Sequence, residues 1–217
     1  MQIQWLGQSC FKIQTKNNGQ EITIITDPYD GSDIGLKALK LTADIVTVSH
    51  NHNDHNHIDA VKGDPFVILT AGEYETKGVL VFGMPAYHDN KEGKERGNIT
   101  IFKISTEDIT IAHFGDLGHD LNSDFLESLG NIDILLLPIG GTYTIDAKKA
   151  SEIISAIEPR IVIPMHYQIP GLKLEAKLNS AEDLVKASGL PSEKMDKLKI
   201  TKKDLPQDET KIIILNP

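Results

Sequence analysis

Residues 44–55 read Asp-Ile-Val-Thr-Val-Ser-His-Asn-His-Asn-Asp-His. The apolar run at 44–48 predicts a buried strand, and four residues that can bind a metal follow it within six positions: His50, His52, Asp54 and His55. Loops at strand ends commonly carry binding and catalytic residues. The segment therefore predicts a metal site at the end of a strand.

The spacing of these side chains favours two metal sites over one. In extended backbone, residues two apart point the same way, so His50 and His52 can bind one cation together. Asp54 and His55 are adjacent and point apart, which indicates a second cation bound by a carboxylate and an imidazole. Neither site is complete, because zinc-type ions take roughly four or five ligands and a catalytic site keeps one position for water.

Three further candidate ligands each follow directly after an apolar run that predicts a strand: His88, Asp116 and His166. Ligands delivered from one edge of a sheet are what a two-metal cleft requires. His113 competes with His88 for the third histidine position. Because His113 lies inside a strand run, we expect it to support a ligand rather than to bind metal.

Length and composition restrict the class of protein. The chain has 217 residues and a formal net charge of −9, which predicts one domain over residues 1–217 and disfavours long nucleic acids as partners. No apolar run approaches about 18 residues, and the N-terminal stretch lacks a signal-type pattern, so we expect no membrane segment. The single cysteine, Cys10, excludes an intramolecular disulfide and favours a cytoplasmic protein. A homo-oligomer remains open.

Hydrophobic patterning predicts an α/β domain whose sheet faces are covered by helices. Asn17-Asn18-Gly19 predicts a tight hairpin turn, since Asn-Gly tolerates positive φ. Helices are expected at 121–129, 146–157 and 180–188. Strands are expected at 3–5, 10–14, 22–26, 45–49, 66–69, 80–82, 99–104, 109–113, 132–137, 160–164 and 211–215.

The order His50-x-His52-x-Asp54-His55, followed by His88, Asp116 and His166, resembles the metallo-β-lactamase superfamily of metallohydrolases. Within that superfamily the chain looks most similar to the ascorbate-6-phosphate-lactonase-like branch of uncharacterised metal-dependent hydrolases. The motifs that carry this closer resemblance are Trp5-Leu6-Gly7, Thr26-Asp27-Pro28, Gly115-Asp116-Leu117-Gly118-His119 and Pro138-Ile139-Gly140-Gly141-Thr142-Tyr143-Thr144.

The resemblance implies a four-layer αββα sandwich of two mixed sheets flanked by helices, with metals at one edge between the sheets. It also implies a role for each ligand. Asp116 would bridge the two metals, the first metal would be bound by His50, His52 and His88, and the second by Asp54, His55 and His166.

The predicted function is metal-dependent hydrolysis of a small-molecule ester, lactone or phosphoester. Two divalent ions with Asp54, Asp116 and a hydroxide give a formal site charge of about +1, which suits a small anionic substrate. The ions would be zinc first, manganese next and iron as a further option, because imidazole and carboxylate suit all three. The alternatives are a metal-dependent nuclease or phosphodiesterase, and a non-catalytic metal-binding protein.

Several other side chains are candidates for supporting roles. Asp54 would orient the attacking water or receive its proton, and His119 is a candidate proton donor or an exposed residue. Tyr143, in a glycine-containing loop, is a candidate substrate contact. Asp27 either orients a ligand imidazole or forms a turn. His57 is expected to be structural or exposed.

Overall fold

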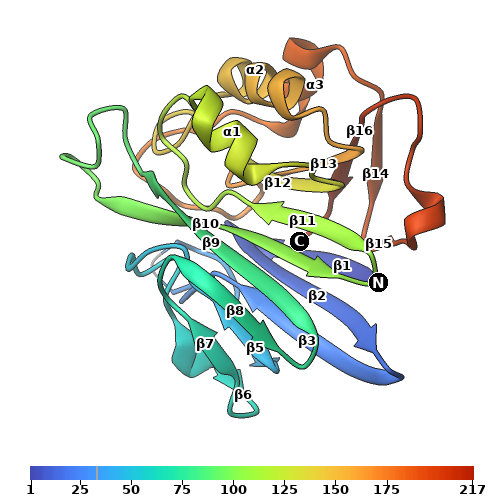
Figure 1. Cartoon of the computed structure of the whole chain (residues 1–217). Helices are drawn as coiled ribbons and strands as arrows, with labels where there is room; N and C mark the ends of the chain where they lie inside the picture. The colour runs from blue at the N-terminus through green and yellow to red at the C-terminus, as the bar shows by residue number, and fades with distance from the viewer. Residues whose placement is uncertain (33) are drawn as a thin grey trace.

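Two β-sheets pack face to face in the computed structural model, which describes residues 1–32 and 34–217 (Figure 1). The smaller sheet has the strand order β15-β1-β2-β3-β5-β7. Across the sheet these strands are β15 (Leu198–Lys199), β1 (Gln2–Gly7), β2 (Cys10–Asn17), β3 (Gln20–Thr26), β5 (Ile45–Thr47) and β7 (Phe66–Ile68).

The larger sheet has the order β14-β16-β13-β12-β11-β10-β9-β8. Its strands are β14 (Ser192–Met195), β16 (Lys211–Leu215), β13 (Ile161–Met165), β12 (Ile134–Pro138), β11 (Ile109–His113), β10 (Asn98–Thr106), β9 (Val79–Tyr87) and β8 (Gly72–Thr76). A separate two-stranded pair consists of β4 (Leu41–Thr42) and β6 (Val61–Lys62). Both large sheets contain parallel and antiparallel pairs, so the expected sandwich of two mixed sheets is confirmed.

The helices gather on one side of the larger sheet, and the smaller sheet covers its other side (Figure 1). A side chain before each helix caps its first turn: Asn122 accepts from Phe125 N, Asp146 accepts from Lys149 N, and Ser180 forms a capping box with Asp183. The helices are α1 (Ser123–Leu129), α2 (Ala147–Ile157) and α3 (Ala181–Ser188), with the 3₁₀ turns η1 (Ile58–Ala60) and η2 (Lys202–Asp204). None of them is long and apolar enough to cross a membrane.

The smaller sheet shows why no helix is needed over its first strands. Along β1 the side chains of Ile3 and Trp5 are completely buried, whereas those of Gln2 and Gln4, which alternate with them, are half-buried. This alternation is typical of an antiparallel sheet with one face on the core and one polar face. In the described part of the chain every α-helix comes after residue 122, so the α-helices form one outer layer of the expected αββα sandwich, over the larger sheet, and none lies on the smaller sheet.

The predicted strands and helices are all present, with shifts of a few residues at their ends. The hairpin turn between β2 and β3 has Asn18 at φ 50° and Gly19 at φ 82°, the positive values that this turn requires. The sequence did not predict the two-residue strands β4, β6 and β15, nor the longer strands β8 and β14. β8 and β14 are edge strands with mainly polar, exposed residues, so neither shows an apolar period.

Strand direction brings one edge of each sheet together. In the larger sheet β9, β11, β12 and β13 all run the same way, because β10 pairs antiparallel with both β9 and β11. In the smaller sheet β3, β5 and β7 are parallel. The carboxyl ends of these strands therefore deliver their following residues to one seam between the sheets.

Candidate metal centre

Histidine and aspartate side chains from both sheets meet at this seam. The segment from His50 to His55 follows β5 of the smaller sheet. His88, Asp116 and His166 follow β9, β11 and β13 of the larger sheet. The structure thus brings together all seven residues that the sequence predicts as metal ligands.

The first group of candidate ligands consists of His50, His52 and His88, whose potential ligand atoms lie within 4.8 Å of one another. His50 Nε2 is 3.0 Å from His52 Nδ1, and the rings of His50 and His88 meet edge to face at 4.8 Å. The sequence analysis favoured His88 over His113 as the third histidine beside His50 and His52, and the structure groups His88 with them. His113 is fully buried and its Nε2 donates instead to the carbonyl of Ser9 at 2.8 Å.

The second group consists of Asp54, His55 and His166. Asp54 Oδ2 lies 3.5 Å from His55 Nε2 and 3.9 Å from His166 Nε2. The two imidazole rings are nearly parallel, at an interplanar angle of 11°. His55 Nε2 is buried and has no hydrogen-bond partner in the described chain, as expected for an atom that binds a metal.

Asp116 lies between the two groups. Its Oδ2 is 3.3 Å from His55 Nε2, 3.5 Å from His88 Nε2 and 3.2 Å from His166 Nε2. Tetrahedral ligands at about 2.0–2.1 Å from a zinc ion lie roughly 3.3–3.4 Å from one another. The spacing of the donor atoms therefore fits divalent metal ions, with Asp116 in contact with both groups.

The charges of the cluster also favour bound cations. Burial raises the pKa of Asp116, but the neighbouring imidazoles of His166 and His55 outweigh it and hold that pKa well below its usual range. Burial lowers the pKa of His166, and Asp116 and Asp54 overcome this and raise it to about 9. Burial and the charge of His55 lower the pKa of His50 to about 3. The cluster thus favours positive charge beside the buried Asp116 and the partly exposed Asp54.

Asp27 orients two of the ligands from behind. It is fully buried at the end of β3, and its Oδ2 accepts from His55 Nδ1 at 2.8 Å and from Ser49 Oγ at 2.6 Å. Ser49 Oγ lies 2.9 Å from His50 Nδ1. Because both Asp27 oxygens already accept hydrogen bonds, we interpret its proximity to His50 and His55 as support rather than as a third metal site.

Gln8 is a site residue that the sequence analysis missed. It lies in the turn between β1 and β2, is 1% exposed, and its Nε2 donates to Asp54 Oδ2 at 3.1 Å. The same nitrogen is 3.4 Å from His166 Nε2. Gln8, Asp27 and His166 all have positive φ, between 39° and 50°, which non-glycine residues adopt rarely and only where the surrounding structure holds them. The sequence offered one sign that Gln8 belongs to the site: it directly follows the Trp5-Leu6-Gly7 motif.

Replacing Gln8 with alanine is expected to lower kcat by about tenfold while the protein stays folded. The change removes the hydrogen bond that fixes Asp54, and such bonds to charged groups contribute about 1.5–3 kcal/mol. Steady-state kinetics beside circular dichroism would measure this. Gln4→Ala, on the polar face of β1, is the matched control, and equal kcat values in both variants would contradict the role.

Gly118 lets two ligand segments approach closely. A Cβ atom on Gly118 would lie 2.2 Å from the carbonyl oxygen of His88. We expect Gly118→Ala to displace the His88 backbone and lower the free energy of unfolding by about 1–3 kcal/mol, the usual range for overpacking. Denaturant unfolding and metal titration would check this, and unchanged metal affinity would show that His88 tolerates the shift.

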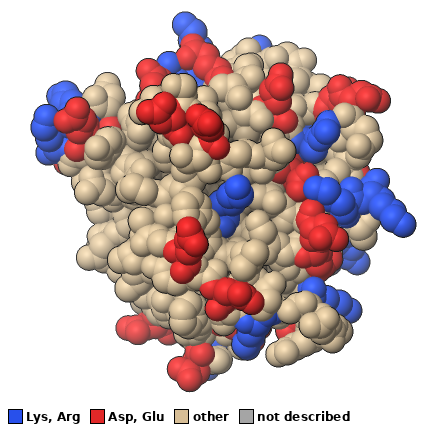
Figure 2. Space-filling view, in the orientation of Figure 1, with Lys and Arg blue, Asp and Glu red and all other residues tan. Residues whose placement is uncertain are grey.

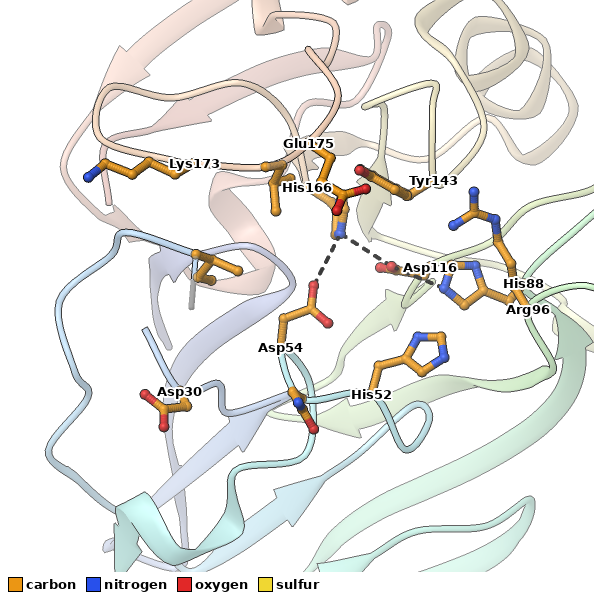
Figure 3. A pocket seen from close by; sticks show the side chains of 13 residues that line it. Asp30, His52, Asp54, His88, Arg96, Asp116, Tyr143, His166, Lys173 and Glu175 are labelled. Atoms are coloured by element: carbon orange, nitrogen blue, oxygen red, sulfur yellow. Dashed lines mark ion pairs between the residues drawn. The ribbon is translucent and has the colours of Figure 1, made fainter. Parts of the chain in front are cut away.

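The ligands open onto a cavity of about 350 Å³ at the seam (Figure 3). Figure 3 shows Asp54 and His52 facing His166, Asp116 and His88 across this space. The remaining residues that line it are Asp30, Ile34, Asn53, Arg96, Tyr143, Lys173, Leu174 and Glu175. Most of these follow no strand end, and the sequence singled out Tyr143 alone among them.

The candidates for supporting roles, Tyr143, His119 and His57, differ in their position relative to the cavity. Tyr143 lines the cavity. His119 does not: its Nδ1 donates to the carbonyl of Asp120 at 2.7 Å, and its Nε2 accepts from Tyr87 N at 3.1 Å. With both ring nitrogens engaged by backbone, the geometry does not support His119 as a proton donor. His57 precedes η1 and lies outside the three ligand groups.

Two packed mixed sheets with a histidine and aspartate cluster at their shared edge define a metallohydrolase-type sandwich. The chain belongs to the metallo-β-lactamase superfamily of metal-dependent hydrolases, since residues 2–166 match the family described as "Beta-lactamase superfamily domain". This confirms the superfamily expected from the sequence motifs.

Named relatives agree with this assignment. A "UPF0173 metal-dependent hydrolase" of Staphylothermus marinus is 31% identical over 194 residues, which cover 76% of this chain and 82% of that protein. A crystal structure from Thermotoga maritima, named as a candidate Zn-dependent hydrolase of the superfamily, is 32% identical with a TM-score of 0.77, covering 99% of both chains. The metallohydrolase Igni18 of Ignicoccus hospitalis shares the fold, with a TM-score of 0.60 at 23% identity over 87% of this chain and 90% of that one. The closer resemblance to the lactonase-like branch stays a prediction.

Proposed function

We propose that the protein hydrolyses a small-molecule ester, lactone or phosphoester with two divalent cations bound at the seam. The carrying observation is the position of Asp116 Oδ2, within 3.2–3.5 Å of histidine nitrogens from both ligand groups. His50, His52 and His88 would bind one cation, and Asp54, His55 and His166 the other. When bound, such a pair supplies an activated water near neutral pH and polarises the attacked carbonyl or phosphoryl oxygen.

Asp54 is the residue that would orient the water and take up its proton. Its side chain is 26% exposed, in contrast to the buried Asp116, and it faces the cavity (Figure 3). Gln8 holds Asp54 Oδ2 from the protein side. A carboxylate fixed by one oxygen and open to the cavity with the other is suited to general base catalysis.

The donor chemistry supports zinc first, manganese next and iron as a further option. Imidazole nitrogens and carboxylate oxygens suit all three ions. Cys10, the single cysteine, is buried and belongs to no ligand group, so no thiolate restricts the choice to a softer ion. The structural relative from Thermotoga maritima is named as a candidate Zn-dependent hydrolase, which adds support for zinc.

The size of the cavity and the surface charge support a small substrate rather than a nucleic acid. About 350 Å³ accommodates a small molecule. Lys and Arg side chains on the face in Figure 2 lie beside Asp and Glu side chains, without a continuous basic patch. A polymer of phosphates is normally bound by clustered basic residues.

The test is a substrate panel with the metal-loaded protein. Protein freed of metal with a chelator would be reconstituted separately with zinc, manganese and iron, and assayed on lactones, carboxylic esters and phosphoesters. We expect hydrolysis of at least one class that disappears with the chelator and returns with metal. Full metal occupancy with no hydrolysis across the panel would overturn the proposal.

A further inference from the structure

Arg96 stands out among the residues of the cavity because none of the carboxylates that the structure describes pairs with it. It is half-buried and lines the cavity, yet no carboxylate in the part of the chain that the structure describes lies within ion-pair distance of its guanidinium. Of the other charged side chains that line the cavity outside the metal cluster, Lys173 and Asp30 lie on the side away from Arg96, and Glu175 lies beside His166 and Tyr143 (Figure 3). In a protein with a net charge of −9, an arginine that lines the cavity without pairing to a described carboxylate is available to bind an anionic ligand.

The loop that carries Arg96 is fixed by a buried carboxylate. Asp89 Oδ1 accepts from the backbone N–H groups of Lys91 and Gly93, at 2.8 and 3.0 Å. Its Oδ2 accepts from those of Glu95 and Arg96, at 3.0 and 2.7 Å. Four charge-assisted bonds from one side chain hold this loop in one conformation directly after the ligand His88.

The guanidinium itself is oriented by an aromatic ring. Arg96 Cζ lies 5.0 Å from the centroid of the Tyr143 ring, within the range of a cation–π contact. Figure 3 shows both side chains on the same side of the cavity as His88. Stacking on tyrosine fixes the plane of the guanidinium and leaves its N–H groups available, which is the arrangement that binds carboxylate or phosphate through two parallel hydrogen bonds.

We propose that Arg96, stacked on Tyr143, binds an anionic group of the substrate beside the metal centre. This proposal rests on the proposed hydrolase function and narrows it to substrates that carry a carboxylate or phosphate near the bond that is cleaved. The scissile group would face Asp54 and the metal ligands, while the remote oxyanion contacts Arg96. Specificity for anionic substrates then comes from the loop after β9 rather than from the metal ligands.

The experiment compares a neutral and an anionic ester with the same leaving group. The metal-loaded protein and its Arg96→Gln variant would be assayed on 4-nitrophenyl acetate and on 4-nitrophenyl hemisuccinate. We expect Arg96→Gln to lower the ratio of kcat/KM for the anionic over the neutral ester by about tenfold to a hundredfold, the size of one charge-assisted interaction. Arg96→Lys should restore part of this ratio, because it keeps the charge but not the planar fork.

Matched controls separate this role from folding and from general loss of charge. Lys94→Gln removes a positive charge from an exposed position of the same loop and should leave the ratio unchanged. Unchanged kcat/KM for the neutral ester shows that Arg96→Gln is folded and loaded with metal. A ratio equal in wild type and Arg96→Gln would overturn the proposal.

Calorimetric titration with succinate and with inorganic phosphate distinguishes the two sources of the oxyanion. Weaker binding of one anion in Arg96→Gln than in Lys94→Gln identifies the group that Arg96 contacts, and equal binding of both anions counts against the proposal. If the loaded protein hydrolyses neither ester, carboxylic esters are excluded as substrates, and the proposed function itself fails only when the lactones and phosphoesters of the panel are not hydrolysed either. This titration still tests Arg96 in that case, because it does not depend on activity.

Discussion

Replacing Asp116 with alanine is expected to remove bound metal and hydrolytic activity together. Asp116 is the one carboxylate whose oxygen lies within 3.5 Å of histidine nitrogens from both ligand groups, among the residues described. Its loss leaves His55, His88 and His166 facing a gap and removes a negative charge from between the two proposed cations. We expect at least a thousandfold drop in kcat, about 4 kcal/mol in transition-state stabilisation.

Elemental analysis and steady-state kinetics on the same preparation would measure both effects. Asp120→Ala is the matched control, because Asp120 lies four residues further along and is exposed, where it pairs with Lys149. That variant should keep both metal and activity. Stoichiometric metal with full hydrolysis in Asp116→Ala would exclude the two-metal proposal.

Asp27→Ala is expected to lower the free energy of unfolding by more than about 3 kcal/mol. Asp27 is fully buried and accepts from Ser49 N, Ser49 Oγ and His55 Nδ1. Each buried donor left without a partner costs about 1–3 kcal/mol. Because the His55 ring would also lose its orientation, metal affinity should fall with stability.

Denaturant unfolding of the metal-free protein would check this effect, with Asp44→Ala as the comparison. Asp44 also accepts a backbone hydrogen bond, from Thr23 N at 2.8 Å, but its side chain is 27% exposed, so water can replace it at little cost. Equal losses of stability in the two variants would contradict the assigned role of burial at Asp27.

The Asp27 contribution should also depend on pH. Burial raises the pKa of Asp27, but the imidazoles of His113 and His55 and the hydrogen bond from His55 outweigh it, so the pKa is below the ordinary value of 3.8. A carboxyl whose pKa is lower in the folded state stabilises the fold above its ordinary pKa and loses this contribution as the pH falls. The stability difference between wild type and Asp27→Ala should therefore shrink below about pH 3.8.

The gathering of the candidate metal ligands at the seam could be predicted from sequence because their positions are set by simple local rules. His50, His52, Asp54 and His55 are contiguous with a strand, and His88, Asp116 and His166 each end an apolar run. Parallel strands deliver such residues to one edge. The same rule indicated Asp27, whose support of His55 and His50 the structure shows.

Residues placed by tertiary contacts escaped this reasoning. Gln8 reaches Asp54 from 46 positions away, and Arg96 depends on a loop folded around a single side chain, Asp89. Neither arrangement leaves a periodic signal in the sequence. Proximity in sequence was misleading for His119: Gly118 packs on the backbone of His88, and the next ring binds the backbone of Tyr87 and Asp120.

The candidate ligands come from both sheets, and this affects local unfolding at the seam. His55 and its neighbours come from the smaller sheet, whereas His88, Asp116 and His166 come from the larger one. A cation bound at the seam would contact residues of both sheets and so stabilise their packing. The metal dissociation constant would then depend on how stably the two sheets pack together. Amide hydrogen exchange in β5 and β13 should then slow in concert when metal is added, although these strands belong to different sheets.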